Sequence, residues 1–341
     1  MNILVIGGTG FISGRLVQFL VEAGHSVSVL TRGKREAAEQ VEHLLGDRDD
    51  ADSLRKAVGD RRFDVVYDII AYTPKQSQIA LEVLAGRTGR FIHCSTISVY
   101  MISDAVRCPI TEDQDRLPPM AHWPRNPFGM DYGLQKRGCE EVLRRAHDEG
   151  ALNVTMLRPT YVCGPGDPTI RDWFWIQRLL DGGPVLVPGS GDHAFQLVYV
   201  DDAARAFADA LDAPHSSGET YNVAGEDILT LNEYLYRIAA LLGREADLVH
   251  VDQEIFDKLP FSRHPRGDVF PFNTRRTAVF SLDRIKRDLR FTSTPFDTWM
   301  KTTIDWYIRE YSGDSLGYDR RSEELAFTDR HLPSIYDPGG V

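Results

Sequence analysis

The chain has 341 residues, of which 42% are hydrophobic, 26% charged and 10% aromatic. These fractions are typical of an ordinary globular protein and exclude disordered, collagen-like and fibrous classes. Lys and Arg number 39 against 50 Asp and Glu, giving a formal charge of -11. This balance repels phosphate backbones, so we expect no nucleic-acid partner. The length predicts a main domain with a smaller appended lobe, because single cores rarely grow so large.

The four cysteines form no C-x-x-C pair, and the ten histidines form no H-x-H or H-E-x-x-H motif. We therefore expect reduced thiols and no metal site. The sequence contains no apolar run long enough to span a membrane, and its first residues lack the basic start of a signal peptide. The expected location is the cytoplasm, without a membrane partner.

Short apolar runs alternate with amphipathic segments in the N-terminal half. The expected strands cover 2–7, 25–31, 41–45, 63–70, 90–95 and 152–157. Helical patterns lie between them, the first with apolar residues at helical spacing from Ile12 to Ala23. This alternation predicts an α/β fold of the Rossmann type, a doubly wound parallel sheet covered on both faces.

Beyond Pro159 the pattern changes to loops rich in glycine and proline. Segments 196–200, 201–211 and 219–223 are expected to return to the main sheet. The predicted dinucleotide-binding domain therefore comprises 1–163 and about 196–225. A smaller, discontinuous C-terminal substrate lobe is predicted over about 164–195 and 226–311, with a C-terminal extension over 312–341.

A glycine-rich turn, GGTGFISG at residues 7–14, joins the first strand to the first helix. Gly7 and Gly10 let the backbone approach a pyrophosphate, whose charge is stabilised by free N–H groups at the helix start. The turn predicts a dinucleotide site made by Gly7, Thr9, Gly10, Phe11 and Ile12. Such turns also occur for packing alone. The third glycine of the pattern is replaced by Ser13, which is expected to crowd the helix–strand contact slightly.

The end of the second strand indicates which dinucleotide binds. It reads LTRGKR at residues 30–35, with three cations and no acid. NAD-binding proteins commonly carry Asp or Glu here, whereas Arg accommodates a 2′-phosphate. Arg32 therefore favours NADP, with NAD possible; the alternative is a solvated basic turn. Asp47, after the third strand, is predicted either to meet the adenine amino group or to serve as a turn residue.

Tyr132 and Lys136 are spaced so that they share one face of a helix. A phenol with a pKa near 10 is a poor base at neutral pH. A neighbouring ammonium and a positively charged nicotinamide favour the phenolate and lower that pKa. The spacing alone is common on solvated helices, but the preceding strand, which ends in Ser95 and Thr96, supports a catalytic interpretation.

Several further motifs occur in a fixed order over roughly residues 1–310: S-T-x-x-V-Y at 95–100, YGLQK at 132–136, LRPTYVCGPG at 157–166, VDDAA at 200–204 and YNVAG at 221–225. With the glycine turn, they make the chain resemble the extended short-chain dehydrogenases/reductases of the NAD(P)-dependent epimerase/dehydratase family. The resemblance implies that Tyr132 moves the proton and that Lys136 holds the ribose. It assigns Thr96 to the reacting oxygen, with Ser95 as the fallback. It also implies cofactor contacts at Ala71 and Pro159.

The resemblance implies an epimerase or oxidoreductase acting on a secondary alcohol or ketone of a sugar-like small molecule, by default a nucleotide sugar. Similar dehydratases carry an Asp-Glu pair directly after the Thr, where this chain has Ile97 and Ser98. Without those carboxylates, elimination has no obvious acid or base. The alternatives are an NADPH-dependent reductase of a non-nucleotide, natural-product carbonyl and a non-catalytic nucleotide-binding protein.

Substrate contacts are assigned to three residues. Tyr161 stands where sugar-nucleotide enzymes of the family often have Asn. Arg263 and Arg266 are predicted to contact phosphates, which guanidinium groups suit, or to be surface charges. The segment 101–127 must pass near the reacting centre, unless it is an inert insertion. A homodimer through the helix that carries Tyr132 is implied by the family, although that helix is rich in charges.

Overall fold

The computed structural model describes residues 1–264 and 267–331, and the chain forms two compact units. Unit 1 comprises residues 1–162, 197–226 and 280–294, and unit 2 the segments 163–196, 227–279 and from 295 onward. Residues 280–294 thus lie in unit 1 rather than in the predicted lobe of 226–311.

Unit 1 is built on a seven-stranded sheet in the order β10-β6-β5-β4-β1-β2-β3, and all its strand pairs are parallel. The predicted doubly wound α/β fold is therefore confirmed. The chain crosses over between β1 and β4, where parallel sheets of this type bind ligands at the carboxyl ends of their strands. The strands are β1 (Asn2–Ile6), β2 (Ser26–Thr31), β3 (Glu42–Leu45), β4 (Phe63–Asp68), β5 (Thr88–Cys94), β6 (Val154–Pro159) and β10 (Thr220–Val223).

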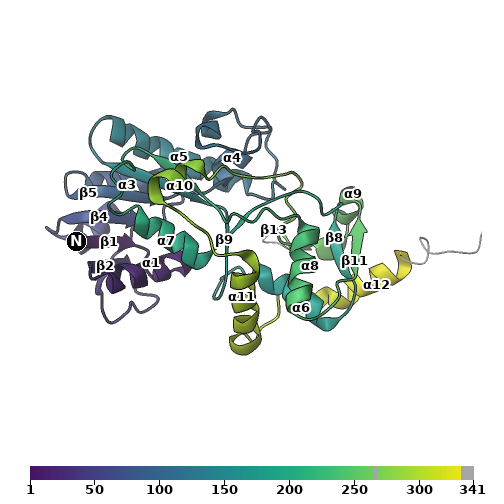
Figure 1. Cartoon of the computed structure of the whole chain (residues 1–341). Coiled ribbons are helices and arrows are strands. Elements are labelled where there is room, and N and C mark those ends of the chain that lie inside the picture. Colours follow the sequence, from purple (N-terminus) through teal and green to yellow (C-terminus); the bar gives the residue numbers. More distant parts are fainter. Residues whose placement is uncertain (265–266, 332–341) are drawn as a thin grey trace, which may run out of the picture. The chain divides into compact units, whose positions relative to one another are not determined.

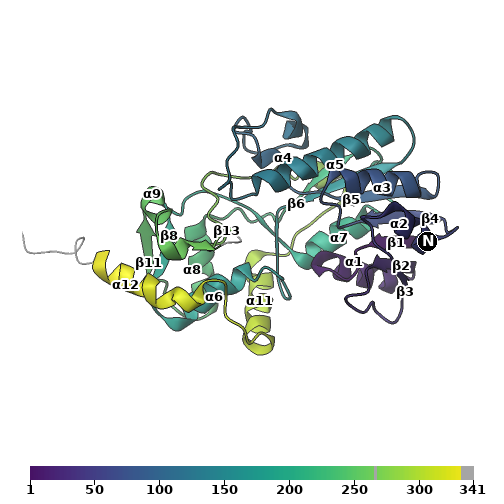
Figure 2. The ribbon, with the colours of Figure 1, turned by 180° about the vertical axis from the view of Figure 1, so that it is seen from behind.

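Successive side chains of the central strand β1 enter two different cores. Ile3 and Val5 pack in the core that includes residues of helices α1, α7 and α10, whereas Leu4 and Ile6 pack with residues of α2, α3 and α5. Because both faces are covered, the strand reads as one continuous apolar run. Figures 1 and 2 show α1 and α7 on one face of the sheet and α3 and α5 on the other. The helices are α1 (Phe11–Glu22), α2 (Ala51–Val58), α3 (Pro74–Leu84), α5 (Met130–Asp148), α7 (Val200–Asp209) and α10 (Asp283–Leu289).

One expected return to the main sheet is wrong. The segment predicted at 196–200 contains β9 (Leu197–Tyr199), which pairs with β7 (Tyr161–Cys163) in a separate two-stranded sheet. The strand ends after three residues because α7 begins directly at Val200. The segment predicted at 219–223 does join the main sheet, as β10 beside β6.

Residues 101–127 are fastened to the rest of unit 1. The Asn126 amide donates to the Met101 carbonyl at 2.7 Å. Arg137 of α5 donates to the Leu117 carbonyl at 2.8 Å. This segment is therefore held by hydrogen bonds within itself and to α5.

A fully buried arginine joins this segment to the sheet. The Arg158 guanidinium, on β6, donates to Glu140 of α5, with Nε to Oε1 at 2.8 Å, and to the Tyr100 hydroxyl. It also contacts Asp115, which belongs to the 3₁₀ helix η1 (Glu112–Arg116). The charge of Glu140 helps to hold the pKa of Arg158 well above its ordinary value against the opposing effect of burial.

The network continues to the edge strand of the sheet. The Tyr100 hydroxyl donates to the side-chain carbonyl of Asn222, on β10, at 2.7 Å. The backbone N–H of Asn222 donates to the Glu112 carboxylate at 3.0 Å. Five elements of unit 1, β6, α5, η1, β10 and the short helix Ser98–Met101, therefore share one set of buried polar contacts.

Replacing Glu140 by Gln is expected to lower the free energy of unfolding by roughly 3 kcal/mol, because the buried Arg158 cation loses a counter-charge. Urea unfolding measures the change. Glu141→Gln is the matched control, since Glu141 is exposed on the same helix, and it should change stability by less than about 0.5 kcal/mol. Equal effects of the two substitutions would contradict a stabilising role of the network.

The described residues of unit 2 form two small sheets and several helices. Strands β8 and β11 pair in parallel, and β12 and β13 pair in antiparallel. Its elements are α6 (Arg171–Asp181), β8 (Val185–Pro188), α8 (Leu231–Leu241), β11 (Leu248–Val251), α9 (Gln253–Phe256), β12 (Arg263–His264), β13 (Gly267–Asp268), α11 (Phe296–Glu310) and α12 (Arg321–His331).

The described end of the chain is an integral part of unit 2. Arg178 of α6 is fully buried and donates to both carboxylate oxygens of Glu324 on α12, at 3.0 and 2.6 Å. Arg321 of α12 donates to Asp181 at 2.8 Å. The residues predicted to form a surface extension over 312–341 therefore include a helix fixed to α6 by buried charge.

Unit 2 also holds a buried polar cluster that no sequence motif indicated. Potential ligand atoms of Cys163, Asp167 and Asp172 lie within 4.8 Å of one another, and all three residues are buried. The Tyr234 hydroxyl donates to Asp172 at 2.6 Å. Burial raises the pKa of Asp172 to about 6, because the carboxylate has lost most of its hydration.

This pKa predicts a pH-dependent contribution of Asp172 to stability. A carboxyl that binds its proton more tightly when folded stabilises the fold at low pH, and the stabilisation is lost as the pH rises through about 6. The stability of the wild type relative to Asp172→Asn should therefore fall by about 2 kcal/mol between pH 4 and pH 7. Urea unfolding at both pH values tests this. Asp319→Asn, at an exposed position of unit 2, should keep a constant difference from the wild type.

Candidate active site

The glycine turn closes around the hydroxyl of Ser13. This hydroxyl donates to the Gly7 carbonyl at 2.6 Å and accepts from the Gly10 N–H at 2.9 Å. Gly7 has φ +85°, and a Cβ there would lie 2.6 Å from the Ile70 side chain, so only glycine fits. Helix α1 begins at Phe11, and the N–H groups of a first helical turn have no intrahelical partners. The turn therefore presents backbone donors at the carboxyl end of β1.

Ser13 has a different role from the expected one. Rather than merely crowding the contact between helix and strand, its hydroxyl bridges the two sides of the turn. An added Cβ at Gly14 would meet nothing within 4 Å, so close packing does not require glycine there.

A cavity of about 360 Å³ in unit 1 adjoins the turn at the carboxyl ends of β1 and β2. Three cations from the end of β2, Arg32, Lys34 and Arg35, line it. Arg35 also donates to the Thr9 carbonyl at 3.3 Å. The donor chemistry fits a dinucleotide, because backbone N–H groups and guanidinium groups are both phosphate ligands. The predicted residues that line this cavity are Gly7, Thr9, Gly10, Arg32 and Asp47.

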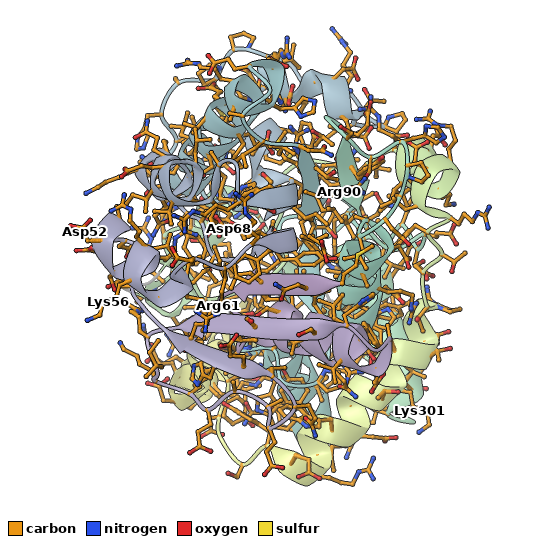
Figure 3. The ribbon with its side chains drawn as sticks, turned by 90° about the vertical axis from the view of Figure 1, so that its left-hand side faces the viewer. Asp52, Lys56, Arg61, Asp68, Arg90 and Lys301 are labelled. Atoms are coloured by element: carbon orange, nitrogen blue, oxygen red, sulfur yellow. The ribbon has the colours of Figure 1, made fainter. Side chains whose placement is uncertain are left out.

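Asp47 both lines the cavity and shapes its turn. Its carboxylate accepts from the Asp49 N–H at 3.0 Å, and its own N–H donates to the Ser53 hydroxyl at 2.9 Å. Asp47 is therefore a turn residue, and its place in the cavity lining is also compatible with the predicted contact with adenine. Arg48 also lines the cavity, but its guanidinium is paired with the buried Asp68 at the end of β4. Figure 3 shows Asp68 in the interior, in contrast to Asp52 and Lys56 at the outer edge.

The helix that carries Tyr132 lies very close to the turn that carries Thr96. A Cβ at Gly133 would come within 2.5 Å of the Ser98 carbonyl, which belongs to the short helix α4 (Ser98–Met101). This approach brings the part of α5 that carries Tyr132 beside the turn that carries Thr96. Tyr132 is 40% exposed, and the centroid of its ring lies 6.5 Å from that of Tyr72, which lines the cavity beside the glycine turn.

The protein alone raises the pKa of Tyr132. Burial is the main cause, the Cys94 thiol acts in the same direction, and the hydrogen bond with Thr96 opposes both. The phenol is therefore protonated at neutral pH. The lowering predicted from the neighbouring ammonium is therefore not found in the protein alone, because Lys136 is not among the main groups that act on this pKa.

Lys136 is fully buried at the carboxyl ends of two central strands. Its Nζ donates to the carbonyl of Ala71, after β4, at 2.6 Å and to that of Cys94, at the end of β5, at 2.5 Å. It also lies 3.3 Å from His93 Nε2. Burial lowers the pKa of Lys136. The predicted residues Ala71, Thr96, Tyr132 and Lys136 are thus brought together.

The other predicted residues have different surroundings. The Ser95 hydroxyl donates to Glu140 in the network around Arg158, so the fallback to Thr96 is engaged elsewhere. The Pro159 carbonyl accepts from the Ile97 N–H at 3.2 Å, beside the Thr96 turn.

The described substrate residues belong to different units, Tyr161 to unit 1 and Arg263 to unit 2. The Tyr161 ring stacks on Phe128 with centroids 5.6 Å apart, within unit 1. Arg263 is exposed in unit 2, where it is in register with Asp268. Arg266 lies outside the described residues.

Sequence reasoning missed the bridging hydroxyl of Ser13, the buried pair Arg48–Asp68, and His93. The sequence did contain signals for the last two: Asp68 ends the apolar strand β4, and His93 lies inside the strand β5. In the described parts of the chain, every helix is too short or too polar to cross a membrane.

Comparison with known proteins agrees with this geometry. The sequence model of the NAD dependent epimerase/dehydratase family matches residues 3–224. The chain is 32% identical over 273 residues to the chloroplast stem-loop binding protein of 41 kDa b from Arabidopsis thaliana, covering 75% of this chain and 67% of that protein. It is 26% identical over 260 residues to 2′-dehydrokanamycin reductase from Streptomyces kanamyceticus, covering 74% and 70%.

A similar solved structure is that of UDP-glucose 4-epimerase with UDP-glucose from Thermotoga maritima. Its TM-score is 0.72 at 21% identity, with 92% of this chain and 100% of that chain covered. The chain belongs to the NAD dependent epimerase/dehydratase family.

Proposed function

We propose that this protein is an NADP(H)-dependent oxidoreductase or epimerase that acts on a secondary alcohol or ketone of a sugar-like small molecule. The observation that carries the proposal is the buried ammonium of Lys136 at the ends of β4 and β5, one helical turn from Tyr132, on a helix that approaches the Thr96 turn closely at Gly133. These groups lie at the carboxyl ends of the central strands, where this family binds its nicotinamide cofactor.

The residues have distinct roles in this proposal. The bound nicotinamide supplies the site that accepts or gives the hydride. Tyr132 takes the proton of the substrate hydroxyl during oxidation and returns it during reduction. Thr96 donates a hydrogen bond to the reacting oxygen. Lys136 donates to the cofactor ribose and favours the phenolate by its charge.

The reaction is either epimerisation or simple reduction. An epimerase returns the hydride to the other face of the ketone, so it retains its cofactor between turnovers. A reductase releases the alcohol and exchanges its cofactor. Elimination is not favoured, because the positions after Thr96 are Ile97 and Ser98 rather than carboxylates. The default substrate is a nucleotide sugar; a non-nucleotide, natural-product carbonyl is supported by the likeness to 2′-dehydrokanamycin reductase.

A second candidate function is binding of an RNA stem-loop, because a relative 32% identical to this chain is named a stem-loop binding protein. The net charge of -11 opposes it. Electrophoretic mobility shift with a stem-loop RNA at 150 mM salt distinguishes the two functions. Tight RNA binding without any redox turnover would favour the second candidate.

The cations at the end of β2 support NADP(H) over NAD(H). Arg32→Ala should weaken NADPH binding by about tenfold, since one charged contact with the 2′-phosphate is lost. NADH binding should be unchanged. Fluorescence titration of both cofactors tests this, and Lys56→Ala, on the exposed surface of α2, is the control. Equal weakening of NADPH and NADH would argue against 2′-phosphate recognition.

Tyr132→Phe should abolish nearly all turnover, by at least 100-fold, because no other group takes the proton. Cofactor binding should persist, since the cavity lining is intact. Steady-state assays with a panel of nucleotide sugars and simpler carbonyls, followed at the absorbance of reduced nicotinamide, provide the measurement. Substantial turnover by the variant would refute the role of Tyr132.

A further inference from the structure

The ammonium of Lys136 has more protein partners than its proposed role requires. An ammonium group carries three N–H donors. In the described part of the chain, Nζ meets three acceptors: the carbonyls of Ala71 and Cys94, and His93 Nε2 at 3.3 Å. The first two are backbone atoms, which nearly any sequence would supply. The third acceptor is the side chain of His93, so this contact depends on which residue occupies position 93.

His93 lies fully buried on β5, and none of the proposed catalytic steps uses it. Its register partner on β4 is Asp68, the acid paired with Arg48. Burial, followed by the charges of Lys136, Arg48 and Arg158, holds the pKa of His93 well below its ordinary value. The ring is therefore a neutral imidazole at physiological pH.

A neutral imidazole has one donor and one acceptor nitrogen. Since the facing group is an ammonium, which only donates, Nε2 must be the acceptor and the proton must sit on Nδ1. Nδ1 has no hydrogen-bond partner among the described residues. The ring thus leaves one nitrogen unsatisfied while the other faces Lys136, which indicates that the contact with the ammonium determines its tautomer.

We propose that His93 is a positioning residue for Lys136: its Nε2 accepts the third N–H, fixes the direction of the ammonium and favours its charged form. The inference rests on the proposed function, in which cofactor binding turns one N–H of Lys136 from a backbone carbonyl to the ribose while the contact with His93 is kept. Burial lowers the pKa of Lys136, so each acceptor helps to keep the ammonium charged. The other titratable groups that act on Lys136 are Asp68 from β4, Cys94 from β5, and Cys139 and Glu140 from α5.

Three substitutions separate the acceptor from the packing of the ring. In His93→Gln, the side-chain carbonyl can take the place of Nε2, whereas the shorter amide of His93→Asn reaches only the place of Nδ1. His93→Leu offers no acceptor. The measurement is NADPH affinity by fluorescence titration between pH 6 and pH 10, with thermal unfolding as the check on folding.

The affinity of the wild type for NADPH should fall at alkaline pH as Lys136 loses its proton. In His93→Leu and His93→Asn this fall should move to lower pH by roughly one unit, while His93→Gln should follow the wild type. Identical profiles for all four proteins would overturn the inference and leave the proposed function intact. A shift common to the three variants, Gln included, would also overturn it, because the effect would follow packing rather than the acceptor.

A second measurement needs neither cofactor nor substrate. Long-range ¹H–¹⁵N spectra of the full chain, with the His93 signals assigned by their absence in His93→Gln, report the tautomer directly. The neutral form with the proton on Nδ1 is expected at pH 7, and Lys136→Met should shift the Nε2 resonance. A proton on Nε2, or a charged ring, would overturn the inference. If the wild type binds no nicotinamide cofactor, the proposed function fails while these spectra still decide the contact.

Discussion

The buried guanidinium of Arg158 is the constraint on which the rest of unit 1 depends. A cation removed from water is tolerated only where counter-charges and acceptors surround it, and Arg158 obtains them from α5, η1 and α4. Two of the contacts border the site directly. Glu140 lies one helical turn beyond Lys136, and Ser95, which donates to Glu140, precedes Thr96. The same set of contacts therefore holds both the helix and the strand end that carry the proposed chemistry.

Within the site, loss of hydration acts on two groups in opposite senses. It raises the pKa of the Tyr132 phenol and lowers that of the Lys136 ammonium, so both groups are pushed toward their neutral forms. Neighbouring groups oppose these shifts. Thr96 acts to lower the pKa of the phenol, and two backbone carbonyls and His93 accept from the ammonium of Lys136. The charge of the buried Lys136 thus depends on a few short contacts away from water, where each is worth more than it would be in water.

The sequence predicts best what short-range patterns determine. The apolar run of β1 correctly indicated a strand covered on both faces, and the order of motifs indicated the family. That order also predicted that Tyr132 lies near Thr96, whereas the close approach of α5 to α4 at Gly133 is a matter of packing that the sequence does not reveal. Features that join distant segments were not predictable. The pairing of β9 with β7 and the fixation of α12 both depend on partners that adjacent residues do not reveal.

The bond between Arg178 and Glu324 has a consequence for how the last helix can vary. Glu324 neutralises the buried guanidinium of Arg178 in unit 2. Helix α12 therefore supplies the counter-charge of an interior cation. A proteolytic cut between α11 and α12 that released α12 would leave the Arg178 guanidinium without its counter-charge. Water would then have to enter unit 2 to solvate that guanidinium. Loss of α12 would consequently change the interior of unit 2, around Arg178, before it changed the surface where the chain was cut.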